Sequence, residues 1–264
     1  MKGDRTIVSN VERALIAADP DLVIDMVPFT VEGANALVTA FGEWNKKVPV
    51  IALSSLDVYA GYGRLHGTED TTHQETPIRE SDTLRTALGP EGATYDKIGV
   101  ETVYHEALDD LTILRAPVIY GWPDGTRIAT YLDPMLDGKK TIVIPENVMP
   151  FRISRSLHKN VAYAITLAST HPLKGQSTYN IAEPSAYSEI EWATRIANLV
   201  GWRGELVAGP PVPNKTFTQD LTADSTAIRS DLGYEEKFDP KEGLRDAVAF
   251  WAHHRTGLPY EKGY

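Results

Sequence analysis

The sequence predicts an α/β protein whose strands form a parallel sheet joined by crossover helices. Three apolar runs, at residues 21–27, 48–53 and 111–114, have the length and composition of buried strands. Residues 31–44 and 94–108 carry helical periodicity between those runs. Strands that alternate with helices pair in parallel, and near-continuous apolar strands indicate that helices cover both faces of the sheet.

The carboxyl ends of these strands predict where a ligand crevice lies, because ligands bind there in open parallel sheets. The residues that follow the three strands are Pro28-Phe29, Ser54-Ser55 and Ala116-Pro117-Val118. A long polar segment, residues 54–92, separates the second strand from the next helix and shows no regular periodicity. A segment of this length without regular structure is commonly functional in a compact domain.

The second half of the chain mixes helices and strands and shows no internal repeat. We predict helices at 126–132, 157–168, 188–200, 224–232 and 241–253, and strands at 141–144, 177–181 and 205–208. Asp133-Pro134 is expected to interrupt the first of these helices. The pattern predicts two regions: residues 1–125 hold the sheet and the crevice, and residues 126–264 form a mixed region that includes a smaller α/β lobe.

The composition excludes several functional classes. The net charge of the 264 residues is −10, which argues against nucleic acid because phosphate binding needs a basic face. The absence of cysteine excludes disulfides, thiolate metal sites and a cysteine nucleophile. No stretch approaches the ~20 apolar residues of a membrane helix, and residues 1–5 lack the apolar run of a signal peptide. We therefore expect a cytoplasmic protein with no nucleic-acid or membrane partner. The spacing of the histidines and acidic residues in the long polar segment fits no metal-ligand pair, so no metal site is expected.

The most informative motif is Leu53-Ser54-Ser55-Leu56-Asp57-Val58-Tyr59, directly after the second predicted strand. Taken alone, its serines are better explained as a strand end whose hydroxyls satisfy backbone donors. The motif resembles the S-S-x-x-V-Y segment of the extended short-chain dehydrogenase/reductase family, the NAD-dependent epimerases and dehydratases. In that family the hydroxyl four residues before the V-Y tyrosine binds the reacting substrate oxygen, which implies this role for Ser55. The resemblance also implies cofactor contacts for Ser54 and substrate contacts for Tyr59.

The segment Y-D-K-I-G-V-E at residues 95–101 resembles the Y-D-K-x-x-V-E pattern of one branch of the family. The common motif is Y-x-x-x-K, in which one helical turn joins the two side chains and the ammonium lowers the phenol pKa. Lys97 matches, but Ala93 stands four residues before it. Tyr95 would lie about 200° from Lys97 around an ideal helix and point away from the crevice. Either the helix begins late enough for Tyr95 to turn inward, or the usual acid/base is missing.

A cofactor site is implied by a further match. Residues 113–121 resemble the L-R-x-x-x-V-Y-G segment, whose backbone lies beside the nicotinamide in the family. This resemblance implies cofactor contacts for Pro117 and Val118, and for Pro28 at the end of the first predicted strand. Lys97 would bind the nicotinamide ribose.

A substrate site is implied by residues 151–155, which resemble the family segment that carries a substrate-binding arginine. Arg152 or Arg155 either clamps a phosphate or carboxylate of the substrate, or forms an ion pair with acidic side chains of the protein. Residues 179–183 and 228–234 match two later family segments in the same order.

The glycine-rich turn that holds the pyrophosphate in dinucleotide-binding domains has no match near the N-terminus. Gly3-Asp4-Arg5 instead resembles the family's G-D-x segment at the end of the third strand, which implies that Asp4 lies near the adenine. About 60 residues, or two βα units, would then be missing, as in a truncated gene product or one piece of a split protein. The strand at residues 21–27 would expose an apolar edge.

The ordered matches imply a Rossmann-like parallel sheet that lacks its first strands, with a smaller α/β substrate lobe. By resemblance, the protein is an NAD- or NADP-dependent oxidoreductase that acts on a hydroxyl-bearing substrate, for example a nucleotide sugar, as a homodimer. Ser55 would orient the substrate hydroxyl, and Tyr95 would transfer the proton beside Lys97. Ala93 and the absent glycine turn favour an alternative, a catalytically inactive binding or regulatory protein with the same fold.

Overall fold

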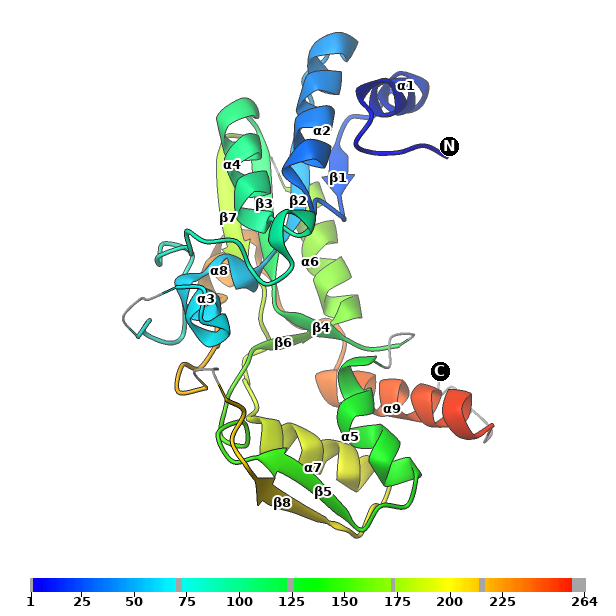
Figure 1. Ribbon diagram of the computed structural model, residues 1–264. Coiled ribbons are helices and arrows are strands. Elements are labelled where there is room, and N and C mark those ends of the chain that lie inside the picture. The colour runs from blue at the N-terminus through cyan, green and yellow to red at the C-terminus, as the bar shows by residue number, and fades with distance from the viewer. Residues whose placement is uncertain (1, 70–72, 123–125, 172–173, 214–216, 258–264) are drawn as a thin grey trace.

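The computed structural model describes residues 2–69, 73–122, 126–171, 174–213 and 217–257. Its main sheet has four parallel strands in the order β1-β2-β3-β7 (Figure 1). These strands are β1 (Val23–Asp25), β2 (Val50–Ser55), β3 (Leu111–Ala116) and β7 (Gln176–Asn180). The three strands expected in the first half of the chain are confirmed, and the second half supplies the fourth.

Helices cover both faces of this sheet. One face carries α1 (Val8–Ala18), α2 (Val31–Trp44) and α4 (Lys97–Ala107), and the other carries α6 (His158–Thr170) and α8 (Thr226–Leu232). Alternation along β2 explains the two layers, because Val50 and Ala52 pack with α2 and α4 whereas Ile51 packs with α6. The predicted parallel sheet with two buried faces is confirmed.

A second lobe lies below the main sheet in Figure 1. It contains α5 (Thr126–Leu136), β5 (Thr141–Pro145), α7 (Glu189–Leu199), β8 (Glu205–Gly209) and α9 (Pro240–Thr256). Strands β5 and β8 pair in parallel, and Ile128, Leu132, Trp192 and Ile196 are buried in the core of the lobe. A short parallel pair, β4 (Val118–Tyr120) and β6 (Arg155–Leu157), lies between the main sheet and the second lobe.

The described part of the segment predicted to lack regular structure, residues 54–92, contains two short helices, η1 (Leu56–Val58) and α3 (Ala60–His66). A third, η2 (Gly92–Thr94), begins at its last residue. Helix α3 was hidden in the sequence by Gly61 and Gly63, which are poor helix formers. Position 63 has no room for a side chain, because a Cβ there would lie 2.3 Å from Cγ of Glu69.

Two helix boundaries also differ from the prediction. Helix α4 begins at Lys97 rather than at residue 94, because the Asp96 carboxylate caps it by accepting a hydrogen bond from the Gly99 amide at 2.9 Å. Helix α5 continues through Pro134 to Leu136, so the predicted interruption is wrong. Pro134 stands near the end of the helix, where the buried side chain of Met135 keeps the last turn packed.

Strand β1 forms one edge of the main sheet and pairs only with β2 within the described residues. Its apolar side chains and those just after it are largely exposed: Ile24 is 42% exposed, Met26 46% and Val27 49%. The expected apolar edge is therefore present. None of the described helices has the length and apolar composition needed to cross a membrane.

Candidate active site

The two serines at the end of β2 point to opposite faces of the strand. Ser54 is buried, and its hydroxyl donates to Glu101 Oε1 at 2.5 Å. Ser55 is half-buried, and its hydroxyl accepts a hydrogen bond from the Asp57 amide at 3.2 Å, which caps η1. Side chains alternate along a strand, so only Ser55 faces the predicted crevice.

Tyr95 lies outside helix α4. It follows η2 with an extended φ of −145°, and α4 begins two residues later at Lys97. The 200° separation of an ideal helix therefore does not apply, and the prediction that Tyr95 points away from Lys97 is wrong. The Ser55 side chain is near enough to the Tyr95 hydroxyl to lower its pKa, and Lys97 Nζ is 5.5 Å from the centroid of the Tyr95 ring. Of the two alternatives, the structure shows the late helix start.

Lys97 is only 3% exposed, with its ammonium held between backbone and aromatic groups. Nζ donates to the Leu53 carbonyl at 2.9 Å and lies 4.6 Å from the centroid of the Phe29 ring. Burial lowers the pKa of Lys97 to about 8, against the opposing effect of the Asp25 and Asp57 carboxylates. The ammonium is thus charged near neutral pH but close to the range in which it loses its proton.

A carboxylate that the sequence motifs did not indicate, Asp57, faces the same cluster. Burial raises the pKa of Asp57. The positive charges of Arg85, whose Nη2 lies 3.6 Å from Asp57 Oδ1, and of Lys97 lower it and so oppose that effect. Burial and Asp57 together raise the pKa of Tyr95, and the hydrogen bond with Ser55 opposes them. The signal available in the sequence was a single charged residue inside an otherwise uncharged strand-end motif.

Tyr59 and Ser54 belong to a closed polar network instead of the crevice. Tyr59 is buried; its hydroxyl donates to Asn180 Oδ1 at 2.7 Å and accepts from Arg115 Nη1 at 2.8 Å. Arg115 also donates to both carboxylate oxygens of Glu101. The roles of Tyr59 in substrate binding and of Ser54 in cofactor binding stay predictions, and these contacts do not support them.

The two candidate substrate arginines form intramolecular ion pairs. Arg152 is partly exposed and pairs with Glu191 at 2.9 Å. Arg155 is buried, pairs with Glu189, and lies 4.5 Å from the centroid of the Trp192 ring. Within the described structure the ion-pair alternative is therefore present for both arginines, and a role in substrate binding stays a prediction.

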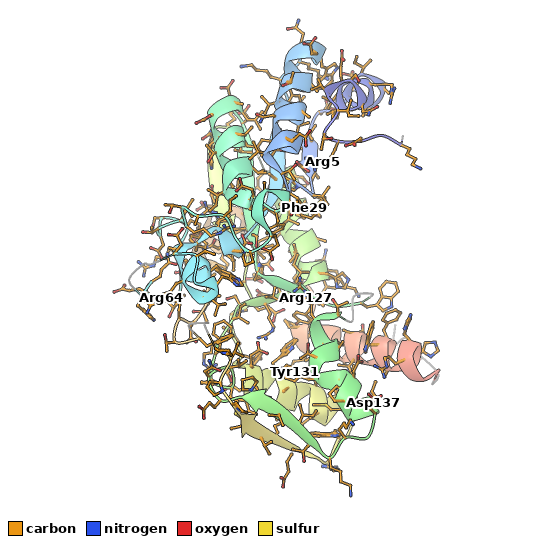
Figure 2. All side chains as sticks on the ribbon, in the orientation of Figure 1. Arg5, Phe29, Arg64, Arg127, Tyr131 and Asp137 are labelled. Carbon is orange, nitrogen blue, oxygen red and sulfur yellow. The ribbon has the colours of Figure 1, made fainter. Side chains whose placement is uncertain are left out.

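The predicted cofactor residues end three neighbouring strands. Pro28 is buried after β1, directly before Phe29, which Figure 2 labels. Pro117 is buried between β3 and β4, with Val118 half-buried beside it. Ser55 ends β2 between them. Because the strands are parallel, these residues lie at the carboxyl end of the sheet, as predicted.

Asp4 lies in the N-terminal segment and is exposed. Its carboxylate accepts hydrogen bonds from the amide and hydroxyl of Thr6, which lower its pKa. Its expected place beside the adenine stays a prediction.

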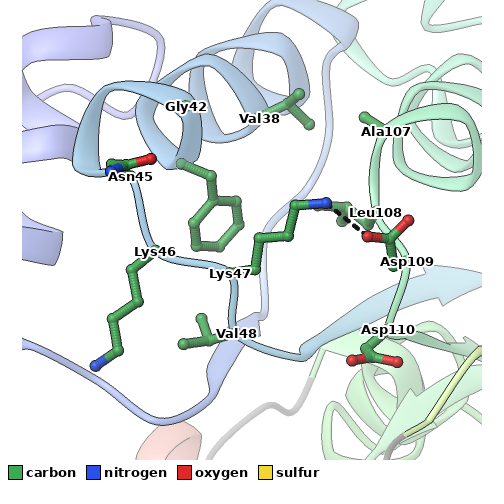
Figure 3. A pocket seen from close by; sticks show the side chains of 11 residues that line it. Val38, Gly42, Asn45, Lys46, Lys47, Val48, Ala107, Leu108, Asp109 and Asp110 are labelled. Carbon is green, nitrogen blue, oxygen red and sulfur yellow. Dashed lines mark hydrogen bonds and ion pairs between the residues drawn. The ribbon is translucent and has the colours of Figure 1, made fainter.

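A cavity of about 310 Å³ lies at the opposite end of the sheet (Figure 3). Val48 and Asp110, just before β2 and β3, line it together with Phe41 from α2. An ion pair between Lys47 and Asp109, 2.7 Å long, crosses its rim. Because Ser55 ends the same β2 strand at its other end, this cavity is separate from the candidate active site.

No family model matches the sequence, and no curated protein matches it. Solved structures match nearly the whole chain. UDP-glucose 4-epimerase from Thermotoga maritima, solved with UDP-glucose, has a TM-score of 0.73 at 19% identity, over 98% of this chain and 85% of that chain. UDP-glucose 4-epimerase from Stenotrophomonas maltophila, with bound NAD and formylated UDP-arabinopyranose, has a TM-score of 0.76 at 17% identity, over 98% and 84%. RMD from Pseudomonas aeruginosa, complexed with NADPH, has a TM-score of 0.74 at 15% identity, over 96% and 88%.

These matches show the fold of the chain, because their sequence identities are low. It is the extended short-chain dehydrogenase/reductase fold, an α/β architecture with a Rossmann-like parallel sheet. The fold class expected from the ordered motifs is confirmed. The roles of individual residues do not follow from such distant matches.

Proposed function

We propose that the chain is an NAD- or NADP-dependent oxidoreductase of the epimerase/dehydratase type that acts on a hydroxyl-bearing substrate, for example a nucleotide sugar. The observation that carries this proposal is the meeting of Ser55, Tyr95 and Lys97 at the carboxyl end of β2. Interconversion of an alcohol and a carbonyl needs a hydroxyl that orients the substrate, a proton-transfer group and a neighbouring positive charge. Similar folds solved with UDP-glucose, NAD and NADPH support this substrate and cofactor class.

Tyr95 is the proton-transfer group in this proposal. The phenol is protonated at neutral pH and can donate a proton to a substrate carbonyl oxygen, but burial and Asp57 raise its pKa and so make the transfer harder until a neighbouring positive charge offsets them. Ser55 holds that oxygen through its hydroxyl. When the proton leaves Tyr95, the Lys97 ammonium stabilises the phenolate, because opposite charges in a buried site attract strongly.

The cofactor would be held at the carboxyl ends of β1, β2 and β3. When bound, it would accept the hydride in alcohol oxidation and return it in carbonyl reduction. Lys97 and Tyr95 offer polar hydrogens for the nicotinamide ribose. Pro28, Pro117 and Val118 lie at the same carboxyl end of the sheet. The glycine-rich turn that holds the pyrophosphate in dinucleotide-binding domains has no match near the N-terminus, so the chain fits a pyrophosphate poorly.

That poor fit favours a second candidate function, a protein of this fold that binds a nucleotide sugar without hydride transfer. The position of Phe29 also favours this second function, because its ring covers one side of the Lys97 ammonium. The two functions differ in dinucleotide binding and in turnover.

The test is calorimetric titration of the chain with NAD and NADP, followed by chromatographic or NMR assays of the sugar products formed from UDP-glucose and related nucleotide sugars, because epimerisation and dehydration release no reduced cofactor. We expect Tyr95→Phe and Lys97→Met to lower turnover by about 100-fold or more. Tyr163→Phe, which changes a half-buried tyrosine on α6, is the matched control and should leave turnover unchanged. Absence of dinucleotide binding, or full activity of Tyr95→Phe, would contradict the proposal; sugar-nucleotide binding alone would support the second candidate.

A further inference from the structure

The position of Tyr95 is not set by a helix. A tyrosine one turn before a lysine would be held by the hydrogen bonds of the helix that carries both residues. Tyr95 instead lies in the short connection between η2 and α4, and Ala93 stands on η2 with its side chain exposed. Other contacts must therefore fix the phenol beside Ser55.

Phe29, from the turn after β1, supplies such contacts through both its ring and its backbone carbonyl. Its ring centroid lies 5.6 Å from that of Tyr95, with the ring planes tilted by 44°, a favourable aromatic geometry. Its carbonyl accepts a hydrogen bond from the Asp96 amide at 2.8 Å. The side chain of Tyr95 and the backbone directly after it are thus both held by one residue.

The same ring covers the Lys97 ammonium. Lys97 Nζ lies 4.6 Å from the Phe29 centroid and 5.5 Å from the Tyr95 centroid, both within cation–π range. Lys97 is 3% exposed whereas Phe29 is 44% exposed, so Phe29 forms the outer layer between the ammonium and water. Removing the ring would open a path for water to Lys97.

Close packing of the first turns of α2 and α4 holds this arrangement together. A Cβ on Gly99 would lie 2.5 Å from Cγ2 of Val31, so the glycine lets the start of α2 lie directly against α4. Thr30 caps α2 by accepting a hydrogen bond from the Gly33 amide at 3.1 Å, which fixes the residue next to Phe29.

We propose that Phe29 is the positioning residue of the candidate active site: its ring holds Tyr95 against Ser55 and shields Lys97 from water. A ring from the neighbouring strand end thereby takes over the positioning that a helix would otherwise provide. The catalytic meaning of this inference rests on the proposed function, but the positioning itself is measurable in the chain alone.

The experiment compares Phe29→Ala with Phe29→Tyr, which keeps an aromatic ring, and with Ile24→Ala, which removes an exposed apolar side chain from the adjacent strand β1. Two measurements need no cofactor: nitration of Tyr95 by tetranitromethane, located by mass spectrometry, and NMR titration of Lys97 in protein with isotopically labelled lysine. We expect Phe29→Ala to speed nitration of Tyr95 several-fold and to move the pKa of Lys97 upward from about 8 toward 10.5, because water replaces the ring. Phe29→Tyr and Ile24→Ala should match the wild type.

Unchanged nitration and an unchanged Lys97 titration in Phe29→Ala would overturn the inference. A folded Phe29→Tyr variant that behaves like Phe29→Ala would overturn it as well, because the ring would then not be the cause. If the chain shows no turnover but both measurements shift, the proposed function fails and the positioning role stands. If the chain turns over and Phe29→Ala keeps the wild-type kcat and pH profile, the positioning role fails and the function stands.

Discussion

Ser54 and Ser55 are neighbours on one strand, yet they belong to polar clusters of different kinds. Ser54 joins a closed network in which the Glu101 carboxylate accepts from Ser54 and from two nitrogens of Arg115. Ser55 joins an open cluster with Tyr95 and Asp57, and Asp57 Oδ1 accepts no hydrogen bond among the described residues.

The two clusters differ in how fully their polar atoms are hydrogen-bonded: the carboxylate of Glu101 is fully paired, whereas Asp57 Oδ1 has, within the described part of the chain, only the Arg85 guanidinium, at 3.6 Å. Buried polar groups are nearly always paired, and an unpaired one needs an explanation. The closed network around Arg115 is complete within the protein, so it stabilises the fold. The open cluster around Ser55 retains capacity for a ligand.

The largest expected effect is on the closed network. Glu101→Leu leaves the Arg115 guanidinium buried without its partner, and we expect the free energy of unfolding to fall by about 3–5 kcal/mol. Urea denaturation measures this loss. Lys47→Ala, which breaks the exposed pair with Asp109, is the control and should leave the midpoint unchanged. A loss below about 1 kcal/mol for Glu101→Leu would show that the network is not structural.

A second prediction concerns pH and the open cluster. The pKa of Lys97 is about 8 in the folded chain, against 10.5 for an ordinary lysine, so the unfolded chain binds more protons between these values. The free energy of unfolding of the wild type, relative to Lys97→Met, should therefore rise between pH 8 and 10.5, by on the order of 1 kcal/mol per pH unit. Denaturation of both proteins across this range gives the difference. A flat difference would mean that the ammonium is well solvated.

The two candidate substrate arginines, Arg152 and Arg155, test whether burial decides the strength of an ion pair outside the main sheet as well. Arg155 is buried against Glu189 and Trp192, and we expect Arg155→Ala to lower the free energy of unfolding by about 2 kcal/mol. Arg152 is partly exposed, and Arg152→Ala should change it by less than about 0.5 kcal/mol. Thermal and urea denaturation of both variants would show equal losses if burial were irrelevant.

The smallest effects compare the two serines directly. Ser54→Ala removes a buried hydrogen bond to a carboxylate and should cost about 1–2 kcal/mol of stability. Ser55→Ala loses the η1 cap and should cost about 0.5 kcal/mol, while abolishing any turnover that the chain has. The comparison would break if Ser55→Ala were the more destabilising variant or kept full activity.

The fold was predictable because apolar runs and helical periodicity record burial directly, as in residues 48–53 and 31–44. The start of α4 was not, because the helical periodicity extends back to residue 94 whereas the folded chain caps the helix at Asp96. That difference decides which way Tyr95 faces.

The site was predictable in its motif residues and hidden in its supporting ones. Ser55 and Lys97 carry family motifs, but Phe29 is a single aromatic residue at a strand end and has no local signature. The arginines were ambiguous because their partners, Glu189 and Glu191, lie more than thirty residues later in the chain. Partners distant in sequence leave no periodic pattern.

The place of β7 beside β3 has a consequence for how the chain assembles. Residues 117–175 lie between these two paired strands, and they include α5, β5 and α6. Closing so long a loop costs chain entropy before the strand pairing offsets it, and such non-local contacts slow folding. We therefore expect the main sheet to be completed late: during synthesis, β1, β2 and β3 emerge first and wait with an open edge at β3 until β7 has been made.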